Sequence, residues 1–307
     1  MPIRVGLVGY GFAGKTFHAP VIAAVPGLRL AAVASRQWEQ LSADLPDVAV
    51  VADPLALVTG ADVDLVVIAS PNETHLPLAL AALRAGRHVV VDKPFTVTLA
   101  QARELAEAAR AEGRILSVFQ NRRWDSDFLG ARQIVAAGRL GEIVHYESHF
   151  DRFRPDVRAR WREQSGPGTG VWFDLGPHLV DQALCLFGLP KTVSARLARQ
   201  RDGAQTDDWA HVVLDYGRLQ VILHGSMLTA GNGPRFILHG TRGSWLKHGS
   251  DVQEDQLLAG MRPGDAGWGH DPVAGHCHDG ATGAVTGAAE PPHQGLGLGP
   301  GPEDPLP

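Results

Sequence analysis

The chain has 307 residues, of which 44% are hydrophobic and 20% charged, so it is long enough for two domains with their own cores and too apolar for a disordered protein. Its formal net charge of −5 argues against a broad nucleic-acid surface, which requires a basic excess. Its two cysteines, Cys185 and Cys277, lie far apart outside any C-x-x-C pair, so we expect neither a disulfide framework nor a thiolate zinc site.

The N-terminus starts with a strand-like run at Ile3–Val8. No basic segment, apolar core and cleavage site precede this run, as they would in a secretory signal peptide. No apolar stretch approaches the length of a membrane span. We therefore expect a cytoplasmic protein that binds no membrane.

Residues 1–120 alternate short β-branched runs with longer segments rich in alanine and leucine. The runs at 5–8, 30–34, 65–69, 88–91 and 115–119 predict strands, and segments such as 76–85 and 99–111 predict helices. This alternation favours parallel strands with helices on both faces of the sheet. The sequence thus predicts an α/β, doubly wound Rossmann domain over residues 1–120.

Strands dominate the region from 121 to 271. A helix at 128–137 ends at Gly138, a second helix covers 173–187, and strands are expected at 143–150, 193–197, 210–214, 219–225 and 235–238. Consecutive strands with short glycine-bearing links favour antiparallel pairing. We expect an α+β domain with a mainly antiparallel sheet that serves the substrate and oligomerisation.

Residues 272–307 are mostly glycine, proline, alanine and histidine, and show no apolar period. Such a segment buries too little surface to offset its loss of conformational entropy, so we expect a disordered tail.

A G-x-G-x-x-G string follows the first predicted strand directly and begins the first predicted helix: Gly9-Tyr10-Gly11-Phe12-Ala13-Gly14. The first glycine permits a tight turn, the second lets the backbone approach a pyrophosphate, and the third lets the helix pack on the strand. The helix N-terminus offers N–H groups and partial positive charge to phosphates. The alternative is a structural β-α turn without a ligand.

The residues after the second predicted strand, Ala34-Ser35-Arg36, bear on the choice of cofactor. NAD sites usually have a carboxylate there for the ribose 2′-hydroxyl, but this chain has none before Glu39. Ser35 and Arg36 could instead accept a 2′-phosphate through charge-assisted hydrogen bonds. NADP(H) is therefore favoured over NAD(H), the alternative being an ordinary surface arginine.

The chain resembles the Gfo/Idh/MocA family of oxidoreductases over residues 3–271. The matching strings are the glycine string, Ser70-Pro71-Asn72-Glu73-Thr74-His75, Asp92-Lys93-Pro94, and Asp174-Leu175-Gly176-Pro177-His178. Within the family the chain looks closest to the NADP-dependent scyllo-inositol dehydrogenases. The strings behind this are Gln120-Asn121-Arg122-Arg123-Trp124-Asp125, Phe150-Asp151-Arg152-Phe153-Arg154-Pro155, Trp161-Arg162-Glu163, and His239-Gly240-Thr241-Arg242-Gly243-Ser244.

The resemblance implies catalytic roles for three residues. Lys93 would stabilise the developing alkoxide, His178 would be the general acid/base and Asp174 its partner. Asp92 replaces the glutamate usual in the family. Alone, Lys93 would be an ordinary loop lysine, and the Asp-x-x-x-His pair a surface pair or half of a metal site. No further ligands stand at matching spacing, so we expect no metal there.

The resemblance also implies binding residues. Ser70, Pro71, Asn72, His75, Asp92 and Lys93 would contact the cofactor, and Asn72 is equally suited to begin a helix. Arg122, Arg123, Trp161 and Arg162 would border the substrate, although such arginine–aromatic groups also occur in ordinary packing.

These assignments predict oxidation of a secondary alcohol of an inositol-like polyol or sugar to a ketone, with a homodimer or homotetramer implied by the resemblance. The alternatives are a dehydrogenase or reductase of another sugar, a cofactor-binding sensor, and an inactive truncated homologue. The last alternative arises because relatives continue past Gly267-Trp268-Gly269 with a further strand and helix, whereas this tail resembles a frame-altered terminus. We then expect lower stability than in a full-length relative.

Overall fold

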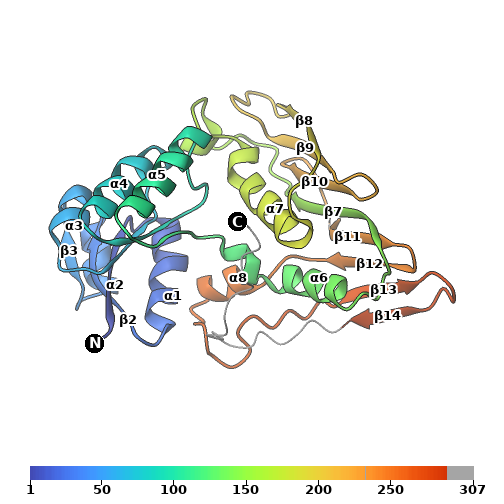
Figure 1. Cartoon of the computed structure of the whole chain (residues 1–307), viewed down its shortest axis with the longest axis horizontal. Coiled ribbons are helices and arrows are strands. Elements are labelled where there is room, and N and C mark those ends of the chain that lie inside the picture. The colour runs from blue at the N-terminus through green and yellow to red at the C-terminus, as the bar shows by residue number, and fades with distance from the viewer. Residues whose placement is uncertain (232, 289–307) are drawn as a thin grey trace. The chain divides into compact units, whose positions relative to one another are not determined.

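A computed structural model describes residues 1–231 and 233–288 (Figure 1), and the chain forms two compact units. The first unit comprises Met1–Gln120 together with Glu254–Trp268, and the second comprises Asn121–Gln253 and the chain from Gly269. The segment Glu254–Trp268, which includes most of α8 (Gln253–Leu258), thus belongs to the first unit and not, as expected from the sequence, to the second.

The first unit contains a six-stranded, entirely parallel sheet in the order β3-β2-β1-β4-β5-β6. Its strands are β1 (Ile3–Val8), β2 (Leu28–Ala34), β3 (Ala49–Val51), β4 (Leu65–Ile68), β5 (His88–Val91) and β6 (Leu116–Val118). The sequence did not indicate β3, which has only three residues. The predicted doubly wound sheet is confirmed.

Helices cover both faces of this sheet, as the alternating side chains of its strands require. On one face, Val8, Val66 and Val89 share a core with α3 (Pro54–Gly60), α4 (His75–Arg84) and α5 (Leu99–Ala111), which lie side by side in Figure 1. On the other face, Val5 and Leu7 pack with α1 (Ala19–Ala24) and α2 (Trp38–Asp44).

The second unit contains an eight-stranded sheet in the order β14-β13-β12-β11-β7-β10-β9-β8. All neighbours are antiparallel except β7 and β10, so the expectation of a mainly antiparallel sheet is confirmed. The strands are β7 (Ile143–Asp151), β8 (Thr192–Ala198), β9 (Trp209–Asp215), β10 (Gln220–Ser226), β11 (Pro234–Gly240), β12 (Gly243–His248), β13 (Gly275–Asp279) and β14 (Val285–Ala288).

Two helices, α6 (Ser126–Ala136) and α7 (Val171–Phe187), lie on one face of this sheet (Figure 1). Their apolar side chains, such as Phe128 and Leu179, form one core with alternate residues of the strands. The remaining residues of β7, β9 and β10 point to the opposite face, where they are only half-buried. In the described part of the chain, no helix is both long and apolar enough to cross a membrane.

The structure corrects the expectation of a disordered tail for residues 275–288. β13 pairs with β12 and β14 with β13, both antiparallel. Cys277 is buried in the common core, whereas His276 and His278 alternate with it on the exposed side. One short alternation of buried and exposed residues in β13 is thus enough when the edge of β12 supplies hydrogen-bond partners, and β14 adds to the edge of β13 in turn. Residues 289–307, the rest of the predicted tail, lie outside the described residues.

Candidate active site

Four segments of interest meet at the carboxyl edge of the parallel sheet. Gly9 N–H donates to the Ala34 carbonyl over 2.9 Å, Ala69 N–H to the Val8 carbonyl over 2.8 Å, and Asp92 N–H to the Ile68 carbonyl over 2.8 Å. The ends of β1, β2, β4 and β5 are therefore held together where ligands bind open α/β sheets.

The three glycines of the loop have different environments. Gly9 has a φ of +97°, and a Cβ atom there would lie 2.5 Å from the Ala69 carbonyl oxygen. A Cβ atom on Gly14 would collide with the Gly9 carbonyl, whereas a Cβ atom on Gly11 would meet no atom within 4 Å. Gly9 and Gly14 thus permit the turn, and the space at Gly11 suits a close phosphate group.

The side chains of the loop point in different directions. Tyr10 is buried in the core beside α2, where its hydroxyl donates to Asp44 Oδ2 over 3.3 Å. Burial and the negative charge of Asp44 raise the pKa of Tyr10 to about 12. Phe12, by contrast, is 58% exposed and packs edge-on against Phe17. Tyr10 therefore offers a cofactor only its backbone, while Phe12 has an accessible ring.

The segment after β2 carries the groups predicted to select the cofactor. Ser35 Oγ accepts the N–H of Gln37 over 3.0 Å, which shapes the turn, and the Arg36 side chain is exposed. No carboxylate occupies positions 34–38. A positive, solvent-accessible side chain next to the glycine loop fits an additional phosphate group.

His75 is 1% exposed, and both of its ring nitrogens lie beside backbone carbonyls. Nε2 is 2.9 Å from the Ser70 oxygen, and Nδ1 is 3.0 Å from the Pro94 oxygen. The ring thus links the segment after β4 to the segment after β5. The sequence suggested a contact with the cofactor ribose, but this arrangement suits His75 to positioning the two loops.

Lys93 follows β5, and its backbone N–H donates to Asp92 Oδ1 over 2.7 Å. The other carboxylate oxygen of Asp92 lies 3.7 Å from Nε2 of His18, a buried residue in the π-helical turn Gly14–His18. Burial alone would raise the pKa of Asp92, but the neighbouring His18 imidazole, together with the charge and backbone N–H of Lys93, holds this pKa below its ordinary value.

In the second unit, the start of α7 (Val171–Phe187) is capped by Asp207, a residue that lies just before β9. The helix begins after Gly170, which has a φ of +97°. Asp207 accepts two of its first N–H groups: its carbonyl accepts from Val171 over 2.8 Å, and Oδ2 accepts from Trp172 over 2.7 Å. This cap fixes the first turn of α7, because the first N–H groups of a helix have no acceptor within the helix itself.

Asp174 and His178 lie one turn apart near the start of α7. His178 is only 4% exposed, and its ring packs edge-on against Phe150 with 6.3 Å between centroids. Asp174 is 26% exposed, with Arg162 Nε 3.7 Å from Oδ1 and Arg152 Nη1 3.9 Å from Oδ2. The structure thus places the predicted residues Arg162 and Asp174 close together, and the guanidinium group of Arg152 lies beside the same carboxylate.

The other predicted substrate residues divide into two groups. The Arg162 guanidinium stacks over the Trp161 ring at 4.7 Å, and both residues are exposed. Arg122, in contrast, donates to Asp125 Oδ2 over 2.9 Å and lies over Phe150 at 5.2 Å, while Arg123 binds both carboxylate oxygens of Asp181. Arg122 and Arg123 therefore have structural ion pairs, which are compatible with a supporting role.

Comparison with known proteins identifies the family. A family model described as the oxidoreductase family with an NAD-binding Rossmann fold matches residues 3–120, and one described as the GFO/IDH/MocA C-terminal domain matches residues 128–246. The chain belongs to the Gfo/Idh/MocA family of oxidoreductases. The resemblance of the sequence motifs to this family is thereby confirmed.

Individual relatives within the Gfo/Idh/MocA family match most of the chain. The uncharacterized oxidoreductase YdgJ of Escherichia coli K12 is 57% identical over 269 residues, which cover 88% of this chain and 78% of YdgJ. IolW, a scyllo-inositol 2-dehydrogenase (NADP(+)) of Bacillus subtilis 168, is 41% identical over 269 residues, covering 88% and 75%. A solved structure from Klebsiella pneumoniae is 57% identical with a TM-score of 0.88, covering 94% of this chain and 80% of that one.

The sequence predicted no role for two residues whose side chains lie beside predicted site residues. His18 faces Asp92, and Arg152 faces Asp174. A histidine in the first turns after a glycine loop is a signal that could have pointed to His18. Arg152 lies inside a string quoted for the family resemblance, but only the fold shows that β7 ends near the first turn of α7.

Proposed function

We propose that this protein is an NADP-dependent oxidoreductase that transfers a hydride between the nicotinamide cofactor and a secondary alcohol of a cyclic polyol or sugar of the inositol type. The observation that carries the proposal is the exposed Arg36 after β2, in a segment tied to the glycine loop and free of carboxylates. The likeness to IolW supports both the cofactor and the substrate class.

The residues at the sheet edge fit a nicotinamide dinucleotide. The open space at Gly11 would receive the diphosphate, Ser35 and Arg36 the 2′-phosphate, and the segments Ser70-Pro71-Asn72 and Asp92-Lys93 the nicotinamide half. When bound, the nicotinamide supplies the redox chemistry, as a hydride acceptor or donor. The protein supplies binding, orientation and charge.

Each proposed catalytic side chain has a surrounding that suits its task. The ammonium group of Lys93 stabilises negative charge on the reacting oxygen, and the carboxylate of Asp92 holds the Lys93 backbone. His178, buried beside Phe150, accepts the hydroxyl proton in oxidation and returns it in reduction. Asp174, already flanked by two arginines, orients the substrate hydroxyls.

The cofactor assignment is tested with Arg36→Ala. Loss of one charge-assisted contact to a phosphate, worth roughly 1.5–3 kcal/mol, corresponds to about a 10- to 150-fold rise in the Kd of NADPH with little change for NADH. Fluorescence titration with both cofactors measures this. Arg29→Ala, which removes another exposed arginine of β2, is the matched control and leaves both affinities unchanged. An equal effect of Arg36→Ala on both cofactors would contradict the assignment.

The substrate assignment is tested by incubating the protein and NADP⁺ with a panel of inositols, aldoses and glucosides and following NADPH formation. Turnover of an inositol supports the proposal. Turnover confined to aldoses or glucosides replaces the inositol class with another sugar. Tight NADPH binding without turnover of any member, in either direction, would favour a cofactor-binding sensor.

A further inference from the structure

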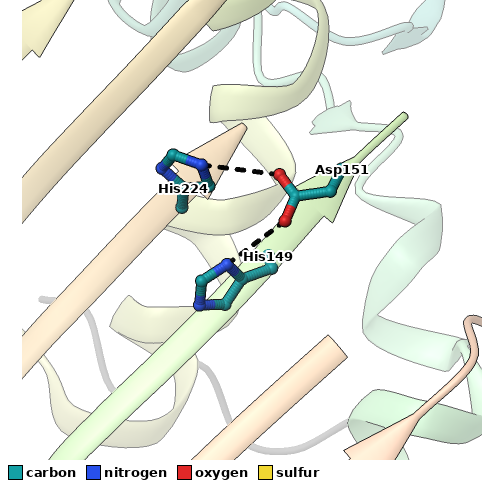
Figure 2. Close-up of side chains that lie close together, drawn as sticks. All are labelled: His149, Asp151 and His224. Carbon is teal, nitrogen blue, oxygen red and sulfur yellow. Dashed lines mark ion pairs between the residues drawn. The ribbon is translucent and has the colours of Figure 1, made fainter. Parts of the chain in front are cut away.

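A histidine-rich cluster lies on the face of the second unit's sheet opposite to α6 and α7. His149 and Asp151 are alternate residues of β7, so their side chains point to the same face. His224 of β10 stands opposite His149 in the parallel pairing of the two strands. Figure 2 shows both imidazole rings turned toward the carboxylate of Asp151.

The distances in this cluster are close to those of a metal site. Nδ1 of His149 is 3.4 Å from Asp151 Oδ2, and Nε2 of His224 is 3.5 Å from Asp151 Oδ1. One ligand atom from each residue lies within 4.8 Å of the other two. Tetrahedral zinc, with bonds of about 2.0–2.1 Å, separates its ligand atoms by about 3.4 Å, so small side-chain rotations suffice.

Both imidazoles also have a partner for the nitrogen that faces away from Asp151. Nε2 of His149 is 2.8 Å from Glu147 Oε2, whose second oxygen is 2.7 Å from His145. Nδ1 of His224 is 3.4 Å from Nδ1 of His211. Metal-binding histidines typically have such outer partners, which fix the tautomer and orient the ring.

The three side chains are 15–19% exposed, so they are shielded by the neighbouring strands yet accessible to an ion. Two imidazole nitrogens and one carboxylate form a donor set that zinc and similar transition metals prefer, whereas calcium and magnesium prefer oxygen ligands. None of these residues is among those proposed for hydride transfer.

We propose that His149, Asp151 and His224 bind one divalent transition-metal ion of the zinc type, with the fourth coordination position open to water or another ligand. The ion links β7 and β10, which form the parallel pair of this sheet. Glu147 and His211 orient the two histidines. In this position the ion stabilises the second unit and takes no part in the proposed oxidoreductase reaction.

The test uses the full chain after treatment with a chelator, titrated with Co²⁺ as an optical probe and then with Zn²⁺ in competition. We expect one equivalent of Co²⁺ per chain with the absorption of a nitrogen- and oxygen-ligated ion, displaced by Zn²⁺. His149→Gln and His224→Gln each weaken binding by about tenfold or more. His278→Gln, on an exposed histidine of β13, is the matched control and retains the site.

Thermal unfolding provides a second measurement that does not depend on activity. Saturating Zn²⁺ raises the Tm of the parent chain and of His278→Gln, because the ion binds the folded state, but not that of His224→Gln. Far-ultraviolet circular dichroism checks that each variant is folded before titration. The proposal would be overturned by equal Co²⁺ affinity in the parent chain and in folded His224→Gln. It would also be overturned if the parent chain bound no Zn²⁺ at about 1 mM. The cofactor titrations described above do not depend on either result.

Discussion

The dipeptide Asp92-Lys93 shows how two adjacent side chains serve different purposes. The Asp92 carboxylate accepts the Lys93 backbone N–H and faces the buried ring of His18, so it fixes the peptide from which the lysine extends. A carboxylate held in its charged form in a buried position also contributes negative potential near the ammonium group. A shorter acid than the glutamate usual in the family therefore still has a clear structural role.

Replacing His178 with alanine tests the proposed acid/base residue. We expect kcat to fall by about 10²-fold or more with the substrate found in the panel, because no group then accepts the hydroxyl proton. The Kd of NADPH is expected to stay the same, because the proposed cofactor residues belong to the first unit. Steady-state kinetics and fluorescence titration measure the two quantities.

The exposed His276 of β13 offers a matched control for that experiment, since His276→Ala removes an imidazole from the same unit without touching α7. Normal turnover by folded His178→Ala would show that another group moves the proton.

The elements of the fold were predictable to different degrees. Five of the six Rossmann strands could be placed because each is a short β-branched run between helical segments, and the alanine- and leucine-rich segment 99–111 predicted α5 with its observed bounds. In the structure, Thr98 and Gln101 form a capping box at the start of this helix. β3 was not predicted, although with three residues it is as short as β6, which the run at 115–119 indicated. β13 and β14 were missed because β13 forms by pairing with β12 and β14 by pairing with β13, which composition does not reveal.

The candidate site was predictable only in part, because contacts between segments far apart in the sequence determine much of its geometry. The glycine string after the first predicted strand indicated Gly9, whereas Lys93 and His178 were assigned from the resemblance to the family. The buried positions of Tyr10 and His75 depend on partners 34 and 19 residues away, namely Asp44 and the Pro94 carbonyl. The sequence does not reveal these distant partners, which set the direction of the two side chains, and a contact of either residue with the cofactor stays a prediction.

The start of α7 offers a prediction at the level of one element. Asp207→Ala removes the carboxylate that accepts the Trp172 N–H, and we expect the free energy of unfolding to fall by about 0.5–2 kcal/mol, as for other lost helix caps. Asp207→Asn keeps an acceptor oxygen and should recover most of this loss. Urea unfolding followed by circular dichroism measures both variants.

Asp202→Ala provides the control, because Asp202 is exposed in the same connection between β8 and β9. Equal stability losses in Asp202→Ala and Asp207→Ala would mean that net charge, and not the cap, accounts for the effect.

The three tyrosines of the chain allow a test of the whole molecule. Burial raises the pKa of Tyr10 to about 12, with a contribution from Asp44, and also raises the pKa of Tyr146 and Tyr216. Both units therefore hold phenols that are harder to ionise in the folded chain than in the unfolded chain, where the pKa is about 10.

The sign of the resulting pH dependence follows from these raised values. As the pH rises, the unfolded chain loses its phenol protons first, so the stabilisation from keeping them is complete below about pH 10 and is lost as the pH rises through about 12. We expect phenolate absorbance to stay low at pH 10 and then to rise together with the loss of the circular dichroism signal. Asp44→Asn should lower the midpoint for Tyr10 alone, because it removes the neighbouring negative charge. Ionisation of all three phenols near pH 10 in a chain that keeps its native circular dichroism would contradict the burial of Tyr10, Tyr146 and Tyr216 on which the two cores depend.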